Sequence, residues 1–559
     1  MSINIKASYD DFRELRENNS YYIDKTDILE EYLLRNFDKA VLFARPRRFG
    51  KTLTMTMFRD FLDIRQDSQN IFQGLKVMKN NELVDEYMNR YPVVFISLKA
   101  VFGDSFESVY QSLCIVVSKL CEENKFLVEE DNKNISEVSR QLFKKLWAQE
   151  AKQTNTEQSL DLISQMLKQY YGKPVFVIID EYDVPMAKAL GTPAYEKVRD
   201  MIEHMLSYVC KTNANVKAVM LSGCLYTVKN SSYTGVNNII PYTVLSSSFA
   251  SGIGFTDMDV KKVLNDAELT DEFDLVSEWY DGYIFGRVKM YCPWDVLLYV
   301  KSVLNDDYSK ANGPESYWLN TSETSLNIIR GFLGKTANVN EMFEQLLAGN
   351  TIECTVKDSL PYHKIHENGD NIWSALLETG YLTKAVTEKM QRMPLRIPNK
   401  EVKVAFRQEV WEFFRDKIDN IYVRDLVDSL WNGENKKAET DLNQILEATL
   451  SFYHEYHEYS YHLILDGFFT GFGYRVQSER ESGFGRSDLL ILDPGRMRGM
   501  ILELKHAKTE SELEAAIREG MLQIAKKHYE SILRYEGYNT YLKYSIAFYD
   551  KNCIIERLT

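Results

Sequence analysis

The segment Val41-Leu-Phe-Ala-Arg-Pro-Arg-Arg-Phe-Gly-Lys-Thr52 is a short apolar run that passes into a basic loop ending in Gly-Lys-Thr. A helical pattern follows, in which Leu53, Met57 and Phe61 recur about one turn apart. A strand, a Gly-Lys-Thr loop and a helix are the context that a phosphate-binding loop requires, because the amides at a helix start face an anion. The pattern predicts an α/β domain with a parallel sheet.

Within this loop, Gly50 would let the backbone approach a phosphate, and Lys51 would reach the β- and γ-phosphates of ATP. The hydroxyl of Thr52 would be a ligand of Mg²⁺. Arg45 stands where the usual motif has its first glycine. Without further support, an ordinary basic turn is therefore an equal alternative.

A second acidic feature supports the nucleotide interpretation. Pro174–Asp183 contains an apolar run that ends in Asp180 and Glu181, which is typical of a buried parallel strand that delivers acids to the ligand-binding edge of a sheet. Asp180 would hold Mg²⁺, and Glu181 would orient or deprotonate the attacking water. Asp183 is equally suited to cap the following helix. A later apolar run ends in Ser222, where a polar γ-phosphate sensor would sit.

Near the C-terminus, Gly485–Ile491 and Gly499–Lys505 are two apolar runs that carry a few charges. Alternation along a strand puts Glu503 and Lys505 on one face, and a hairpin would bring Asp488 to it. Two carboxylates beside an ammonium can hold a divalent cation and activate water for attack on phosphate. This pattern suggests a nuclease; a solvated hairpin edge with a surface ion pair is the alternative.

Helical patterns flank this hairpin. A pattern that runs from about Leu442 to Leu465 carries Glu458, and the segment Ser511–Leu533 carries Gln523. These segments together favour a complete catalytic site, with an acid on the first helix, three charged residues on the hairpin and an amide on the second helix.

Length and composition exclude several classes of protein. At 559 residues the chain is too long for one core, and no apolar run is long enough for a transmembrane helix. The N-terminus lacks the apolar region of a signal peptide, and the seven cysteines form no C-x-x-C pair, so we expect a cytoplasmic protein. The net charge of −14 counts against non-specific coating of DNA.

The middle of the chain lacks motif chemistry. Its pattern predicts helix, strand, strand and helix between residues 372 and 416, as in a winged-helix-like module. Such a module could bind DNA, although a packing or relay role is favoured. The polar segment Asn432–Glu439 is the predicted linker. The expected domains are residues 1–320, 321–435 and 436–559.

The first half resembles the predicted AAA-ATPase-like family over about residues 5 to 320. The resemblance is carried by these segments, among others: Tyr21–Thr26, Arg45–Thr52, Ile179–Asp183, Gly235–Asn238 and Trp279–Tyr283. In that family Arg-Pro-Arg-Arg-Phe-Gly-Lys is the normal loop. The resemblance implies that ATP is bound by Arg45, Arg48, Phe49, Gly50, Lys51, Thr52, Asp180 and Ser222. It also places Asp24 and Lys25 near the base of the nucleotide.

The C-terminal hairpin resembles the PD-(D/E)XK nuclease superfamily, which has an α/β restriction-endonuclease-like fold, although Ser487 replaces the proline of its name. The resemblance implies Asp488 and Glu503 as ligands of Mg²⁺ or Mn²⁺, with Lys505 positioning the nucleophile or stabilising developing phosphate charge. Glu458 would be a third acid and Gln523 an accessory residue of the same site.

Together these features predict an ATP-controlled, Mg²⁺-dependent nuclease that acts on nucleic acid, with DNA favoured over RNA, in defence or DNA processing. The alternative is a signalling or scaffold ATPase whose nuclease-like domain binds nucleic acid or a partner without cutting. No membrane partner is expected, and a homo-oligomer is possible because AAA-like ATPases often assemble.

Overall fold

A computed structural model of the chain describes residues 3–129, 133–227, 236–305, 313–317, 342–343, 345–347, 349–357, 360–365, 367–385, 392–415, 420–449, 458–478, 481–482, 485–486, 488–527, 530–535, 537–538 and 540–558. The chain divides into two compact units. The first consists of Met1–Ser325 and Glu353–Val402, and the second of Leu326–Ile352 and Lys403–Thr559. Within the described ranges, no helix is both long and apolar enough to cross a membrane.

The first unit is built on a five-stranded sheet in the order β2-β3-β4-β1-β5, and all neighbouring strands are parallel. The strands are β1 (Ala40–Ala44), β2 (Val93–Ser97), β3 (Val175–Asp180), β4 (Val216–Gly223) and β5 (Ile240–Tyr242). Every residue of β1 and β3 is buried, as expected for strands covered on both faces. The predicted α/β domain with a parallel sheet is confirmed.

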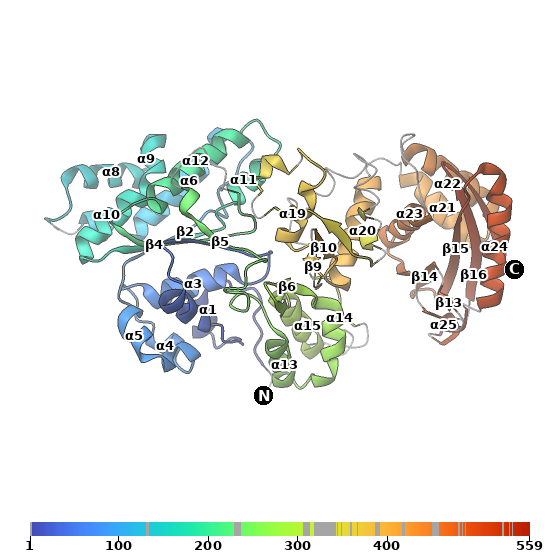
Figure 1. Cartoon of the computed structure of the whole chain (residues 1–559), viewed down its shortest axis with the longest axis horizontal. Coiled ribbons are helices and arrows are strands. Elements are labelled where there is room, and N and C mark those ends of the chain that lie inside the picture. Colours follow the sequence, from blue (N-terminus) through green and yellow to red (C-terminus); the bar gives the residue numbers. More distant parts are fainter. Residues whose placement is uncertain are drawn as a thin grey trace. The chain divides into compact units, whose positions relative to one another are not determined.

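Helices cover both faces of this sheet (Figure 1). One layer contains α1 (Phe12–Glu17) and α3 (Lys51–Leu62), and the other contains α6 (Phe106–Glu123), α10 (Ser159–Tyr171) and α12 (Tyr195–Cys210). The carboxyl ends of β1, β3 and β4 therefore meet at one edge, where doubly covered sheets bind ligands.

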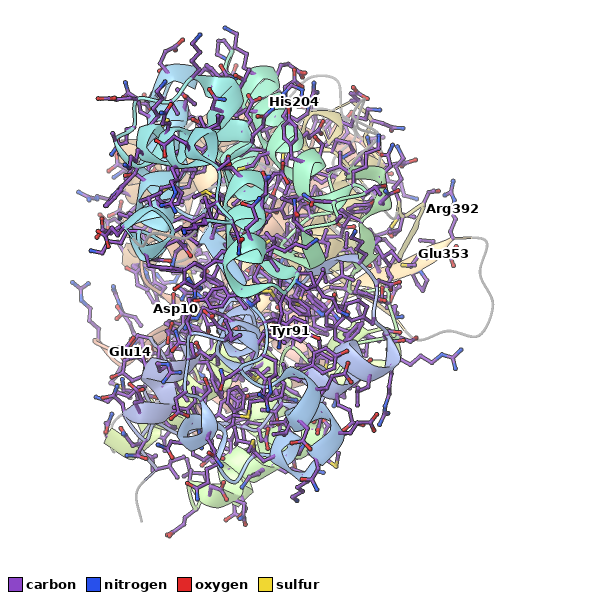
Figure 2. The ribbon with its side chains drawn as sticks, turned by 90° about the vertical axis from the view of Figure 1, so that its left-hand side faces the viewer. Asp10, Glu14, Tyr91, His204, Glu353 and Arg392 are labelled. Atoms are coloured by element: carbon purple, nitrogen blue, oxygen red, sulfur yellow. The ribbon has the colours of Figure 1, made fainter. Side chains whose placement is uncertain are left out.

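Residues 353–402 of the first unit contain the helix and strands predicted for the middle module. They form α19 (Asn371–Thr379), β9 (Thr383–Lys384) and β10 (Met393–Arg396), and α20 (Lys400–Arg415) follows. Strand β8 (Ile352–Cys354) completes a small sheet in the order β8-β10-β9. Glu353 of the edge strand β8 and Arg392, just before the central strand β10, lie close together in Figure 2.

The second unit contains a five-stranded sheet in the order β11-β14-β15-β16-β17. The strands are β11 (Arg475–Ser478), β14 (Leu489–Asp493), β15 (Arg498–His506), β16 (Thr540–Tyr549) and β17 (Asn552–Leu558). Strands β14 and β15 form the predicted antiparallel hairpin, whereas β15 and β16 run parallel. The sheet is consistent with the fold expected for the C-terminal part of the chain.

Alternation along β14 separates the two faces of this sheet. Leu489 and Ile491 pack with α21 (Asn420–Asn432), α22 (Asn435–Thr449) and α23 (Glu458–Gly471). On the opposite face, Leu490 and Leu492 pack with Ile501 of β15 and with Ile524 of α24 (Leu513–Lys527). The even-numbered residues of β14 and the odd-numbered residues of β15 therefore face α24, which lies along the sheet in Figure 1.

Two local predictions differ from the structure. The polar segment Asn432–Glu439, predicted as a linker, largely forms the start of α22, and the Glu439 carboxylate accepts the main-chain N–H of Ile555 at 2.9 Å. Polarity there reflects the exposed side of a packed helix, with Lys436 67% exposed. The helical segment predicted over Ser511–Leu533 is divided into α24 and α25 (Glu530–Tyr535).

Candidate functional site

The basic loop after β1 encloses the ammonium of Lys51. Gly50 has a φ of 93° at the start of α3, a left-handed conformation that favours glycine. Lys51 is only 4% exposed, and its Nζ donates to the carbonyl oxygens of Arg45 at 3.1 Å and Pro46 at 3.2 Å. Phosphate oxygens of a nucleotide could replace these carbonyls as acceptors.

The acidic end of β3 lies against this loop. The Thr52 hydroxyl donates to Asp180 Oδ2 at 3.0 Å, and the Ser222 hydroxyl donates to Asp180 Oδ1. Burial raises the pKa of Asp180, and the neighbouring Glu181 raises it further. Glu181 has a φ of 54°, a conformation that costs free energy in residues other than glycine and often marks functional sites. The structure thus brings four predicted site residues together.

Asp183 stands at the N-cap position of α11 (Val184–Ala189), but its side chain makes no capping hydrogen bond there. Its Oδ2 atom instead accepts the main-chain N–H groups of Cys224 at 3.0 Å and Leu225 at 3.1 Å. Asp183 therefore fixes the peptide that follows β4, and the helix-capping alternative does not describe it.

The arginines of the loop point in different directions. Arg45 is fully buried, and its guanidinium donates to the carbonyl oxygens of Tyr242 at 2.7 Å and Phe249 at 2.9 Å. This arrangement favours a structural role for Arg45 in place of the predicted contact with ATP. Arg48 is exposed, and its guanidinium lies 4.0 Å from the ring centre of Trp294.

Phe49 is an aromatic anchor for the loop, because its ring centre lies 5.1 Å from those of Tyr283 and Phe285. Arg47, another arginine of the basic run, lies beside the acids. Burial lowers the pKa of Arg47, but neighbouring groups, Glu181 and Asp183 among them, raise it overall. Its position within the basic run was the available signal, but no local pattern distinguished it from the other arginines.

A pocket with a cavity volume of about 80 Å³ opens beside the loop. Its lining is mainly apolar and includes Tyr22, Lys25, Phe49, Gly50, Phe255 and Leu297. Lys25 lines the same pocket as Gly50, and its ammonium pairs with Asp259. Asp24 instead accepts main-chain N–H groups, those of Thr26 at 2.9 Å and Lys76 at 2.7 Å.

In the second unit, the register of the β14–β15 hairpin groups the predicted charged residues. Leu489 is opposite Leu502, so Asp488 lies opposite Glu503. Lys505 Nζ donates to Glu503 Oε1 at 2.9 Å, which puts both side chains on one face of β15. Asp488 Oδ2 accepts the main-chain N–H of Leu504 at 2.7 Å. Glu503 is fully buried, and a carboxylate buried in a sheet is costly unless it is paired or coordinated.

Comparison with known families agrees with both predicted domain types. The family model of a predicted AAA-ATPase matches residues 6–232, and that of the PD-(D/E)XK nuclease superfamily matches residues 456–558. The chain joins an AAA-ATPase-like domain to a PD-(D/E)XK nuclease superfamily domain. It is also similar to a protein of Azotobacter chroococcum mcd 1, described as an uncharacterized protein in the vnfD 5' region, with 26% identity over 404 residues that cover 71% of this chain and 68% of that protein.

Helix α24 of the PD-(D/E)XK domain lies over the charged face of the hairpin. A Cβ atom at Gly520 would be 2.2 Å from Ser545 Oγ and 3.4 Å from Lys505 Cγ, so any larger residue would require Ser545 or α24 to move. Gln523 is almost one turn further along the same helix, on the side of the sheet that carries Glu503. Glu458 begins α23, and its side chain lies outside the described residues.

His462 is a further residue of the PD-(D/E)XK domain, and it was not among the predicted site residues. It is 6% exposed, and its Nε2 atom lies 2.8 Å from the carbonyl oxygen of Asp488. Four residues along α23, the buried Asp466 forms an ion pair with Arg407 at 3.0 Å. A histidine on an apolar helix, next to an acid one turn away, was the available signal.

The donor set of the hairpin suits a hard divalent cation. Asp488 and Glu503 supply carboxylate oxygens, which Mg²⁺ and Mn²⁺ prefer, and Mg²⁺ usually keeps several water ligands. Among the residues that the structure describes, no group of three or more histidine, cysteine, aspartate or glutamate side chains forms a larger metal site. Two protein carboxylates completed by water therefore fit the site.

Proposed function

We propose that this protein is a nuclease whose metal-dependent activity is controlled by ATP. The observation that carries the proposal is the pairing of Lys505 with Glu503, directly across the hairpin from Asp488. Two carboxylates and an ammonium on one sheet face match the needs of phosphodiester hydrolysis. DNA is the favoured substrate, and we expect a cytoplasmic role in defence or DNA processing.

In the AAA-ATPase-like domain, the ammonium of Lys51 would pair with the β- and γ-phosphates, and Thr52 with Asp180 would hold Mg²⁺. Glu181 follows Asp180 and would orient the attacking water. The neighbouring pocket, lined by apolar groups, would receive the base. All of these residues lie in the first unit.

In the PD-(D/E)XK domain, Asp488 and Glu503 would hold the divalent cation. A bound cation supplies an activated water and offsets the charge of the scissile phosphate. Lys505 would hold the phosphate by ion pairing, and it would exchange its contact with Glu503 for one with the phosphate oxygens. Gln523 would add a polar contact from α24.

Cleavage assays test this proposal. Labelled single-stranded, double-stranded and branched DNA and RNA are incubated with the full chain and Mg²⁺ or Mn²⁺, with and without ATP. Glu503→Ala should abolish cleavage, whereas Glu514→Ala, a change at a side chain that is 77% exposed, should not. Cleavage by Glu503→Ala at the wild-type rate would refute the site assignment.

The rival function is an ATPase that signals or acts as a scaffold through a non-cutting nuclease-like domain. Its supporting observation is the modest donor set, since the described residues offer two carboxylates at the hairpin and no larger cluster. ATP turnover without cleavage of any of these substrates, together with binding of nucleic acid or protein by the second unit, would favour this rival.

A further inference from the structure

The segment Glu353–Val402, here called the docking segment, belongs to the first unit and contacts the AAA-ATPase-like domain at two places, Asp183 and Pro46. The first contact is made by Tyr362, which is 3% exposed. Its hydroxyl donates to Asp183 Oδ2 at 3.1 Å. That carboxylate oxygen also accepts the N–H groups of Cys224 and Leu225, so three donors converge on it.

The peptide held by Asp183 reaches the phosphate-binding lysine. Cys224 Sγ lies 3.6 Å from Lys51 Nζ. One residue earlier, Gly223 ends β4 and leaves no room for a side chain, since a Cβ atom there would be 2.7 Å from Asp183 Oδ1. Tyr362 therefore acts on the surroundings of Lys51 through Asp183 and the main chain.

The second contact is made by Gly380, at the C-terminus of α19. Its φ is 90°, and a Cβ atom added there would be 2.7 Å from Pro46 Cβ. Pro46 belongs to the loop whose carbonyl oxygens now hold Lys51 Nζ. When Lys51 turns to a phosphate, these carbonyls lose their donor, and any movement of Pro46 changes its contact with α19.

Further hydrogen bonds attach the docking segment to the same region. Glu378 Oε2 accepts the N–H of Tyr226 at 3.3 Å, and the N–H of Leu360 donates to the carbonyl oxygen of Tyr226 at 3.2 Å. Tyr226 directly follows Leu225, whose N–H Asp183 accepts, so these bonds attach the peptide after β4 to the docking segment.

We propose that the docking segment completes the nucleotide site, with Tyr362 as a positioning residue that holds Asp183 and the peptide after β4 against Lys51. ATP turnover then depends on the docked segment, and the segment responds to the nucleotide through Pro46. This inference rests on the proposed ATP binding and assigns the middle module a relay role in place of DNA binding.

Steady-state ATP hydrolysis by the full chain tests the positioning role. Tyr362→Phe removes one donor to a carboxylate, so kcat should fall about tenfold while KM changes less than about twofold. Tyr299→Phe is the matched control, because the Tyr299 hydroxyl donates to Glu272 Oε2 over the same 3.1 Å but away from the loop. This control should keep wild-type kinetics.

A second pair of variants tests the contact with Pro46. Gly380→Ala and Gly172→Ala introduce the same strain at a helix end, with φ of 90° and 71°, but a Cβ atom at Gly172 has no neighbour within 4 Å. Only Gly380→Ala should weaken ATP binding, by about tenfold. These variants keep the question testable if melting curves show that Tyr362→Phe is unfolded.

Hydrogen exchange of the wild-type chain separates this inference from the proposed function. Saturating ATP should slow amide exchange around Tyr362 and Gly380, and Lys51→Ala should prevent that change. If ATP binds but exchange is unchanged and Tyr362→Phe retains its kcat, the docking role is wrong while ATP binding stands. If the wild-type chain binds no ATP, both the proposed function and this inference fail.

Discussion

The Nε2 atom of His462 lies 2.8 Å from the main-chain carbonyl oxygen of Asp488. A carbonyl oxygen only accepts hydrogen bonds, so Nε2 carries the proton. Burial lowers the pKa of His462, which favours the neutral imidazole near neutral pH. A neutral histidine in this tautomer fixes the main chain of one proposed cation ligand.

His462→Leu should therefore raise the Mg²⁺ concentration required for half-maximal cleavage by about tenfold, as expected for a residue that orients a metal ligand. His462→Gln keeps an N–H donor of similar reach and should recover part of this affinity. Titration of cleavage with Mg²⁺ is the measurement. Equal Mg²⁺ dependence of the His462→Leu variant and the wild-type protein would show that the contact is structural only.

Asp488 has two separable roles, because one of its oxygens accepts the N–H of Leu504 at 2.7 Å. Asp488→Asn keeps an acceptor for this N–H but loses the charge, so cleavage should fall at least about 100-fold with little change in stability. Asp488→Ala also removes the acceptor and should lower the free energy of unfolding by about 1–3 kcal/mol. Urea unfolding and cleavage rates, measured on both variants, test this difference.

Gly520 allows α24 to approach the sheet. Alanine normally stabilises a helix interior by about 1 kcal/mol relative to glycine. Here a Cβ atom would be 2.2 Å from Ser545 Oγ, so Gly520→Ala should instead destabilise the second unit by about 1–3 kcal/mol. The double variant Gly520→Ala with Ser545→Ala should regain part of the loss in thermal unfolding. A stabilised single variant would contradict the close approach.

Asp295 should make the stability of the first unit depend on pH. It is 1% exposed, and burial raises its pKa from 3.8 to about 6. The pKa of Asp295 is higher in the folded chain than in the unfolded chain. The contribution of Asp295 to the free energy of unfolding is therefore fully present below pH 3.8 and is lost as the pH rises through about 6. Asp295→Asn should remove this slope, roughly 1.4 kcal/mol per pH unit within that window. Urea unfolding from pH 4 to 7 measures it, with the exposed Asp85→Asn as control.

Lys51→Ala should lower ATP turnover at least about 100-fold, because it removes the ammonium expected to meet the β- and γ-phosphates. Lys99→Ala, a change at a side chain that is 73% exposed, should have no such effect. The second unit should keep its unfolding transition in both variants. Retained turnover in Lys51→Ala would contradict the phosphate-loop assignment.

Local patterns in the sequence predicted the geometry of the contiguous parts of both candidate sites. The parity of Glu503 and Lys505 follows from strand geometry, which is the same in every chain, and their 2.9 Å contact agrees with it. The strand, loop and helix around Gly50 are likewise contiguous, so their order alone predicted the turn that the structure shows. Family resemblance then supplied the roles of these residues.

Contacts between distant groups could be learned only from the folded chain. Tyr362 and Asp183 are 179 residues apart, and no local pattern connects a tyrosine in the middle module with an acid after β3. The sequence suggested that Arg45 contacts phosphate. In the folded chain its guanidinium instead donates to the carbonyl oxygens of Tyr242, in β5, and Phe249. Local periodicity is set by backbone geometry, whereas such contacts depend on how separate segments pack. This packing decides whether a charged side chain is available to a ligand or is used to hold the fold together.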